Sequence, residues 1–239
     1  MSIKDKIAIV QQQLKQAAIL SGRTQEDIRL IAVSKTKSTE MILQALAAGQ
    51  SAFGENRVQE ALGKIEDLTK LPLVEWHLIG HLQKNKVKFC PGNFQWIHTI
   101  DSTELAEKLE ARSAFAQKKI NVLLQVNLSR EITKSGLHDW EDILQVSETI
   151  LSGKWLKLRG LMTIPPPNIG ETPTRKIYEK LRLWRDKLKQ DLDSPEITEL
   201  SMGMTADFHW AIQEGATMIR VGSAIFGERN EDMDSSTNM

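Results

Sequence analysis

Leu30-Ile31-Ala32-Val33-Ser34-Lys35 is a short apolar run that ends in two polar residues, and it is the first of eight such runs along the chain. Longer segments with helical spacing separate most of them. Strands that alternate with helices are typical of βαβ units and a parallel sheet. The eight predicted strands are Leu30 to Lys35, Ala52 to Asn56, Trp76 to Gly80, Phe94 to Asp101, Val122 to Asn127, Leu158 to Ile164, Ile197 to Met202 and Met218 to Val221.

The segments outside these strands predict the helices. Ile7, Val10, Leu14 and Ala17 follow the period of one apolar helix face, which predicts a leading helix over residues 2–20. Similar spacing recurs between most strands, but the segments after the third and seventh strands are short and weakly patterned. Eight parallel strands separated by helices close most economically into a TIM-type (β/α)8 barrel, with an open doubly wound sheet as the structural rival.

Length and composition suit one such domain. The chain has 239 residues, close to the roughly 250 of a typical barrel. We predict a single domain over residues 1–229 and a disordered polar tail over residues 230–239.

The charge balance and the single cysteine limit the class of protein. Lysine and arginine (31) equal aspartate and glutamate (31), so no global field favours nucleic acid or an anionic membrane. Cys90 is the only cysteine, which excludes an internal disulfide. The first residues have no apolar signal core and no run approaches about 18 apolar residues, so we expect neither a signal peptide nor a membrane-spanning helix. We expect a cytoplasmic protein. His77 and His81 are separated by a predicted strand and turn without an acidic third ligand, so we expect no metal site.

Functional groups of a β/α barrel come from the C-terminal ends of its strands. Lys35 ends the first strand, where a desolvated amine could attack a carbonyl group. A lysine of this kind on its own is more often a residue that reaches solvent. The ends of the seventh and eighth strands favour a functional lysine over one that only reaches solvent.

Those two ends carry glycine and serine, in Ser201-Met202-Gly203 and Arg220-Val221-Gly222-Ser223. Loops after strands seven and eight form the recurring phosphate site of this fold. The hydroxyl groups of Ser201 and Ser223 can donate hydrogen bonds, and Gly203 and Gly222 let backbone N–H groups approach an anion. A single glycine and serine pair would be explained by a glycine that ends a strand and a serine that caps a helix. Two glycine and serine pairs on adjacent predicted strands predict phosphate binding.

Strand eight pairs with strand one in a closed barrel, so the predicted phosphate site adjoins Lys35. The ligand therefore carries a carbonyl group and a phosphate, as pyridoxal 5'-phosphate (PLP) does and as a phosphorylated sugar aldehyde or ketone also does. Arg220 facing a pyridine nitrogen would favour PLP, and Asn56, at the end of strand two, could bond the phenolic oxygen of that cofactor.

Several segments resemble the PLP homeostasis proteins, often called the YggS or PROSC family. The similar segments are Ala32-Val33-Ser34-Lys35-Thr36-Lys37, Phe53-Gly54-Glu55-Asn56-Arg57-Val58-Gln59-Glu60, Trp76-His77-Leu78-Ile79-Gly80-His81-Leu82-Gln83-Lys84-Asn85-Lys86, Gly160-Leu161-Met162-Thr163-Ile164, Ser201-Met202-Gly203-Met204 and Arg220-Val221-Gly222-Ser223-Ala224-Ile225-Phe226-Gly227. The resemblance implies a barrel like the N-terminal domain of alanine racemase, with Lys35 carrying PLP as a Schiff base.

The resemblance also implies a carrier or regulator of vitamin B6 and amino-acid pools without established catalysis. Alanine racemases have a second domain and a catalytic tyrosine, whereas the single tyrosine here, Tyr178, falls on a predicted outer helix. We therefore expect no catalytic residue, PLP-dependent apo-enzymes as recipients of the cofactor, and a monomer. A low-activity PLP-dependent amino-acid racemase and a cofactor-free Schiff-base aldolase are the alternatives.

Overall fold

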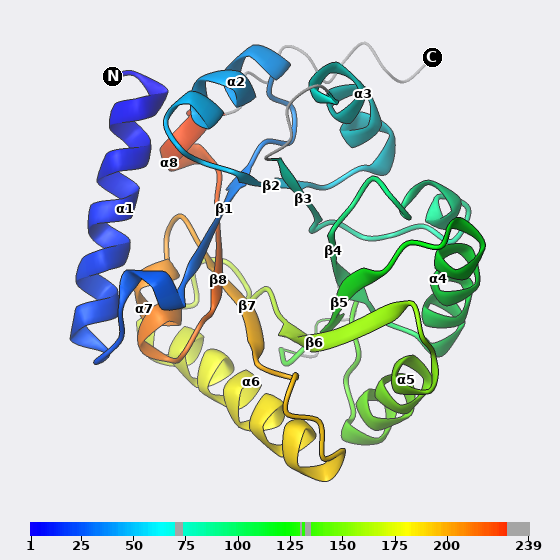
Figure 1. Ribbon diagram of the computed structural model, residues 1–239. Helices are drawn as coiled ribbons and strands as arrows, with labels where there is room; N and C mark the ends of the chain where they lie inside the picture. The colour runs from blue at the N-terminus through cyan, green and yellow to red at the C-terminus, as the bar shows by residue number, and fades with distance from the viewer. Residues whose placement is uncertain (70–73, 130, 132–134, 229–239) are drawn as a thin grey trace.

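The chain forms a closed barrel of eight parallel strands in sequence order (Figure 1). In this computed structural model, residues 1–69, 74–129, 131 and 135–228 are described, so the predicted tail over residues 230–239 lies outside the described residues. The strands are β1 (Arg29–Val33), β2 (Ala52–Glu55), β3 (Glu75–Leu78), β4 (Trp96–Ile100), β5 (Ile120–Gln125), β6 (Leu156–Met162), β7 (Glu199–Met204) and β8 (Met218–Val221). Pairing of β8 with β1 closes the sheet, which confirms the predicted barrel over the open sheet.

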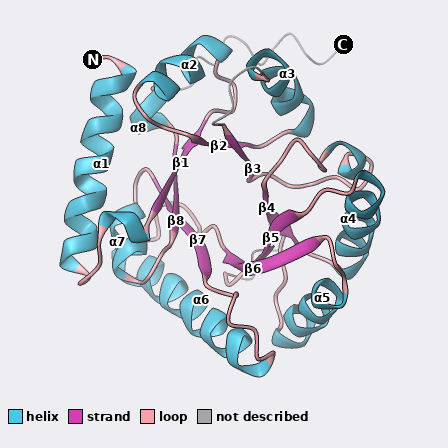
Figure 2. Cartoon of the chain, viewed as in Figure 1, coloured by secondary structure: helices cyan, strands magenta, loops and turns pink. Residues whose placement is uncertain are grey.

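Helices surround the barrel on its outside (Figure 2). The short segments predicted after the third and seventh strands hold only one turn of 3-10 helix (η2) and the six-residue α7. The helical elements are α1 (Ile3–Leu20), η1 (Gln25–Asp27), α2 (Thr39–Ala47), α3 (Val58–Leu68), η2 (Val87–Phe89), α4 (Thr103–Ala116), α5 (Trp140–Ser152), α6 (Glu171–Asp191), α7 (Phe208–Gln213) and α8 (Ser223–Phe226).

The leading helix α1 covers part of the barrel where the helices α7 and α8 are short. Ser2 caps it, because the Ser2 hydroxyl accepts from the Asp5 N–H at 3.2 Å and the Asp5 carboxylate accepts from the Ser2 N–H at 3.0 Å. Its apolar face, with Ile7 and Leu14, is buried. The helix packs against α7, α8 and α2 and so covers the side of the barrel beside β1 and β8 (Figure 1).

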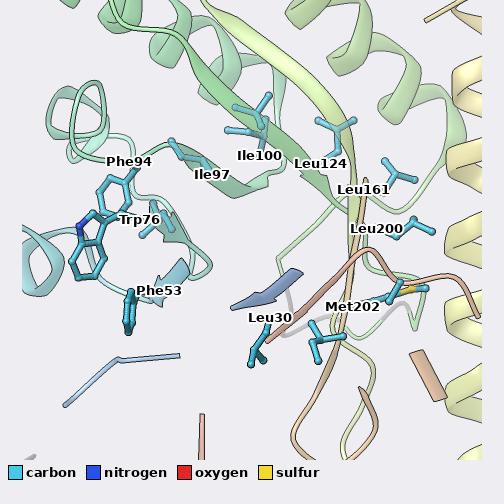
Figure 3. Close-up of a cluster of buried hydrophobic side chains, with 14 of the residues drawn as sticks. Leu30, Phe53, Trp76, Phe94, Ile97, Ile100, Leu124, Leu161, Leu200 and Met202 are labelled. Atoms are coloured by element: carbon cyan, nitrogen blue, oxygen red, sulfur yellow. The ribbon is translucent and has the colours of Figure 1, made fainter. Parts of the chain in front are cut away.

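Side chains of the strands are buried on both sides of the sheet, as expected of a parallel sheet enclosed by helices. Outward-facing residues pack against the helices, and ten side chains of this layer, from Leu30 to Met202, are labelled in Figure 3. Inside the barrel a smaller cluster is apolar and contains Ile31, Ala52, Trp96, Leu123, Met162 and Met218.

The interior of the barrel becomes polar toward the C-terminal ends of its strands. His98 lies two residues beyond Trp96 on β4, and Arg220 lies two residues beyond Met218 on β8. Because side chains alternate along a strand, these polar residues point to the same interior face as the apolar ones below them. Both are buried.

Candidate functional site

A cavity of about 400 Å³ opens among the C-terminal ends of the strands. This volume is within the range typical of small-ligand sites. Five of the seven site residues predicted from the sequence line it, namely Lys35, Asn56, Arg220, Gly222 and Ser223. The full lining is Val33, Lys35, Thr36, Lys37, Asn56, Ile79, Ile164, Met204, Thr205, Ala206, Arg220, Gly222, Ser223, Gly227 and Glu228.

Lys35 lies in the turn that follows β1. The strand itself ends at Val33, two residues earlier than predicted, although the Ser34 N–H still donates to the Gly54 carbonyl of β2 at 3.0 Å. Thr36 has a φ of +62°, a left-handed conformation that is uncommon for a residue other than glycine. The turn therefore needs support from its surroundings to hold the lysine over the cavity.

That support is a buried ionic cluster around Lys64 of α3. The Lys64 ammonium donates to the Ser34 carbonyl at 2.7 Å, to Glu55 Oε1 at 2.8 Å and to Glu60 Oε1 at 2.7 Å. The Ser34 hydroxyl donates to Glu55 Oε1 at 2.6 Å, and the Thr36 N–H donates to Glu60. Both residues next to the lysine in sequence are thus tied to one cluster, which the sequence analysis did not identify.

The ends of β7 and β8 meet at the cavity next to β1. Ser223 begins α8, and its hydroxyl donates to the Thr205 hydroxyl at 3.3 Å. A Cβ at Gly222 would lie 3.3 Å from the Cβ of Val33, so glycine allows β8 to approach β1 closely here. Thr205 was not predicted as a site residue, although a hydroxyl two positions after Gly203 was a signal that could have pointed to it.

Ser201 and Gly203 are not among the residues that line the cavity, and both lie within β7, which continues to Met204. The Ser201 hydroxyl is buried in the barrel, where it accepts from Arg220 Nη1 at 2.6 Å. Gly203 has a φ of +92°, and a Cβ there would lie 2.6 Å from the Cβ of Ala211 on α7. The structure thus gives Ser201 a contact inside the barrel and Gly203 a packing contact with α7, and the anion contacts predicted for them stay a prediction.

Arg220 connects the barrel interior to the cavity. Its Nη1 donates to Ser201, and its Nη2 donates to the Thr163 carbonyl at 3.0 Å. Burial lowers the pKa of the guanidinium, but arginine remains charged at neutral pH even so. A guanidinium has five N–H donors in a rigid plane, and two such contacts fix that plane relative to the cavity.

Tyr178 and Lys37 differ in their relation to the cavity, because only Lys37 lines it. Tyr178 is on α6, as predicted, and its buried side chain is not part of the cavity lining. Lys37 lies in the loop after β1 and donates to the Gly227 and Glu228 carbonyls at 3.2 and 3.0 Å.

Within the part of the chain that the structure describes, no group of three or more His, Cys, Asp or Glu side chains could hold a metal ion. No helix formed by these described residues is long and apolar enough to cross a membrane.

Comparison with known proteins identifies the family. Residues 10–230 match the family model described as the alanine racemase N-terminal domain. The pyridoxal phosphate homeostasis protein of Pasteurella multocida is 41% identical over 232 residues, which cover 96% of this chain and 99% of that protein. The chain belongs to the pyridoxal phosphate homeostasis protein family. The expectation drawn from the sequence segments is therefore confirmed for the family and for the fold.

Solved structures place this member of the pyridoxal phosphate homeostasis family among related barrels. PipY of Synechococcus elongatus, in a structure with PLP bound, is 37% identical and superposes with a TM-score of 0.84 over 95% of this chain and 100% of that one. Alanine racemase of Clostridium difficile superposes with a TM-score of 0.74 at 16% identity, over 95% of this chain and 58% of the racemase. The second likeness shows a shared fold alone.

Proposed function

We propose that the chain is a PLP-binding homeostasis protein that holds the cofactor on Lys35, at the mouth of the barrel. The observation that carries the proposal is the single cavity that brings the Lys35 amine, the Arg220 guanidinium and the Ser223 hydroxyl together. Family membership and the PLP-bound structure of PipY support the same cofactor. In this role the protein stores PLP and contributes to the regulation of vitamin B6 and amino-acid pools.

The residues around the cavity suit each part of this cofactor. PLP supplies an aldehyde for a Schiff base and an electron-accepting ring. Lys35 is assigned the Schiff base and Arg220 the ring nitrogen, while Asn56 is assigned the phenolic oxygen. The phosphate is assigned to Ser223, the Gly222 backbone and, in place of Ser201, Thr205, because the structure has Thr205 in the cavity lining. Gly222 lines the cavity without a side chain, so its backbone N–H can approach the phosphate closely.

Two features support a carrier over a racemase. Arg220 can only donate to the ring nitrogen, so it favours the unprotonated ring, which withdraws electrons more weakly. A two-base proton transfer also needs a second group opposite the lysine. Tyr178, the only tyrosine, lies buried on α6 away from the cavity lining.

Absorption spectroscopy with a matched pair of lysine variants tests the assignment. The purified protein should gain a visible band on addition of PLP, and borohydride reduction should abolish the band and leave the label on Lys35. Lys35→Ala should lose the band. Lys37→Ala is the matched control, because Lys37 lines the same cavity but is held by two backbone carbonyls. Retention of the full band by Lys35→Ala would refute the assignment.

Catalysis and cofactor transfer are tested separately with the loaded protein. Slow or absent exchange of the α-hydrogen of amino acids in deuterated water is expected, and exchange at a useful turnover would indicate a racemase. We also propose that PLP-dependent apo-enzymes receive the cofactor, in which case activation of an apo-enzyme should exceed that given by the free PLP released at equilibrium.

The proposal includes a monomeric protein in the cytoplasm. Large exposed hydrophobic side chains of the described residues are spread over several helices and include Ile19 of α1, Leu43 of α2, Phe115 of α4 and Leu183 of α6. Sedimentation equilibrium should give the mass of one chain, and a concentration-dependent dimer would contradict this part of the proposal.

A further inference from the structure

A continuous chain of hydrogen bonds runs through the inside of the barrel from Arg220 to the opposite end of the sheet. Beyond Ser201, the ring of His98 on β4 lies with Nδ1 2.8 Å from the Ser201 hydroxyl. His98 Nε2 lies 2.9 Å from Nδ1 of His77 on β3, and His77 Nε2 lies 2.7 Å from Glu75 Oε1. Five side chains from four strands thus form one line, which we call the interior relay (Glu75, His77, His98, Ser201 and Arg220).

The two ends of the interior relay have opposite charges and different surroundings. Arg220 lines the cavity at the mouth, whereas Glu75 is the first residue of β3 and lies at the other end of the barrel. There Glu75 is 3.3 Å from Arg29 and helps to line a separate cavity of about 450 Å³. Burial raises the pKa of Glu75, but the hydrogen bond to His77 and the charge of Arg29 outweigh it and hold that pKa below its usual range.

The three middle members are fully enclosed. His77, His98 and Ser201 each have 0% of their surface exposed. Burial lowers the pKa of both histidines, so each ring is neutral at pH 7 and carries one N–H. A neutral imidazole donates from one nitrogen and accepts at the other, and that property makes the direction of the chain deducible.

The direction follows from the Glu75 end. An ionised carboxylate only accepts, so His77 donates from Nε2 and accepts at Nδ1. His98 must then donate from Nε2 and accept at Nδ1, where the Ser201 O–H is the donor among the described residues. The Ser201 oxygen in turn accepts from Arg220. Every hydrogen bond therefore points from the cation toward the anion, and each polarises the next.

We propose that His77, His98 and Glu75 are positioning residues, which through Ser201 hold the Arg220 guanidinium in the orientation that meets the ring of PLP. The inference rests on the proposed function for its ligand, but the relay itself is a property of the protein without cofactor. This positioning role accounts for buried polar residues inside a barrel, where the interior is ordinarily filled by bulky aliphatic side chains.

The first test measures the histidines in the protein without PLP. Nitrogen-15 spectra of histidine-labelled protein should show both rings with the proton on Nε2, and neither ring should titrate near pH 6.5. In Glu75→Leu the His77 Nε2–H loses its acceptor, so the tautomer with the proton on Nδ1 should become populated. A wild-type spectrum with either proton on Nδ1, or a charged ring at pH 7, would overturn the relay.

The second test measures the consequence for the cofactor. His98→Leu and Glu75→Leu should weaken PLP binding by about tenfold to a hundredfold, as when outer-shell partners of a bound metal are removed, and should shift the visible band. Glu75→Gln keeps an acceptor oxygen, so it should lose less affinity than Glu75→Leu. His209→Gln changes an exposed histidine of α7 and serves as the matched control.

The outcomes separate this inference from the proposed function. If the wild-type protein does not bind PLP, the proposed function fails and the assigned ligand of Arg220 fails with it, while the nitrogen-15 spectra still decide whether the relay exists. If PLP binds normally to folded Glu75→Leu and His98→Leu with an unshifted band, the positioning role is refuted and the proposed function stands. Circular dichroism and the spectra of the remaining histidines establish that each variant is folded.

Discussion

Replacement of Lys64 by methionine tests the structural account of the Lys35 turn. The side chains of Lys64 and Glu55 are 9% and 0% exposed, and the substitution removes the ammonium while it keeps most of the apolar stem. Breaking a buried ion pair from one side typically costs about 3–5 kcal/mol, because the remaining charge is left without compensation. Since the free energy of unfolding of a domain is only about 5–15 kcal/mol, Lys64→Met should lose a large part of it.

Urea unfolding at several pH values measures this loss. Burial already raises the pKa of Glu55, and removal of Lys64 should raise it further. The folded state then binds a proton at a higher pH than the unfolded chain, so the stability of the variant should fall as pH rises through the folded pKa. The deficit relative to wild type should therefore be larger at pH 8 than at pH 5.

Two further variants make the test specific. Glu55→Gln combined with Lys64→Met removes the buried charge but keeps an acceptor for the Ser34 hydroxyl, so it should recover part of the lost stability. Lys108→Met is the matched control: Lys108 pairs with Glu104 four residues before it, as Lys64 does with Glu60, but the Lys108 and Glu104 side chains are 48% and 52% exposed. An exposed pair is worth about 0–1 kcal/mol. A loss in Lys64→Met no greater than in Lys108→Met would refute the buried-charge reasoning.

Three other predictions follow from the packing and burial of single residues. Gly203→Ala should destabilise the protein by about 1–3 kcal/mol in urea unfolding, because the new Cβ would lie 2.6 Å from Ala211 at a φ of +92°; an unchanged midpoint would contradict this. His77 and His98 have folded pKa values below those of the unfolded chain, so acid favours unfolding: stability should fall below pH 6.5 by up to roughly 1.4 kcal/mol per pH unit for each ring. That slope should be reduced in His98→Leu, and an equal slope would argue against the assignment. Burial raises the pKa of the Cys90 thiol to about 12, so an aromatic disulfide reagent at pH 8 should label it only after unfolding; rapid labelling of the native protein would be inconsistent with the fold.

Much of the fold was predictable from the sequence because its signals are local. The eight apolar runs and the helical spacing between them depend on residues within a few positions of one another. All eight strands and the leading helix are where they were predicted, with differences of a few residues at most at their ends. The positions of Lys35, Asn56, Gly222 and Ser223 at the mouth followed from the rule that strand ends carry the site.

The ends of strands were the weaker part of that prediction, and they altered the site. The continuation of β7 to Met204 moved Ser201 below the mouth and brought Thr205 to the cavity. A strand end depends on how far the neighbouring strands pair with it, and the sequence of one segment does not contain that information.

Contacts across the barrel were decided by the tertiary structure alone. His98 and Ser201 are 103 residues apart in sequence, and Ser34 is 30 residues from Lys64. Neither pair has a local signal, because closure of the barrel determines which inward-facing side chains meet. The sequence by itself determined that Lys35 shares one mouth with Gly222 and Ser223, the residues proposed to bind a phosphate. The tertiary structure decided how the lysine turn and Arg220 are held there, because buried charges and polar groups need partners that only the closed barrel brings within hydrogen-bonding distance.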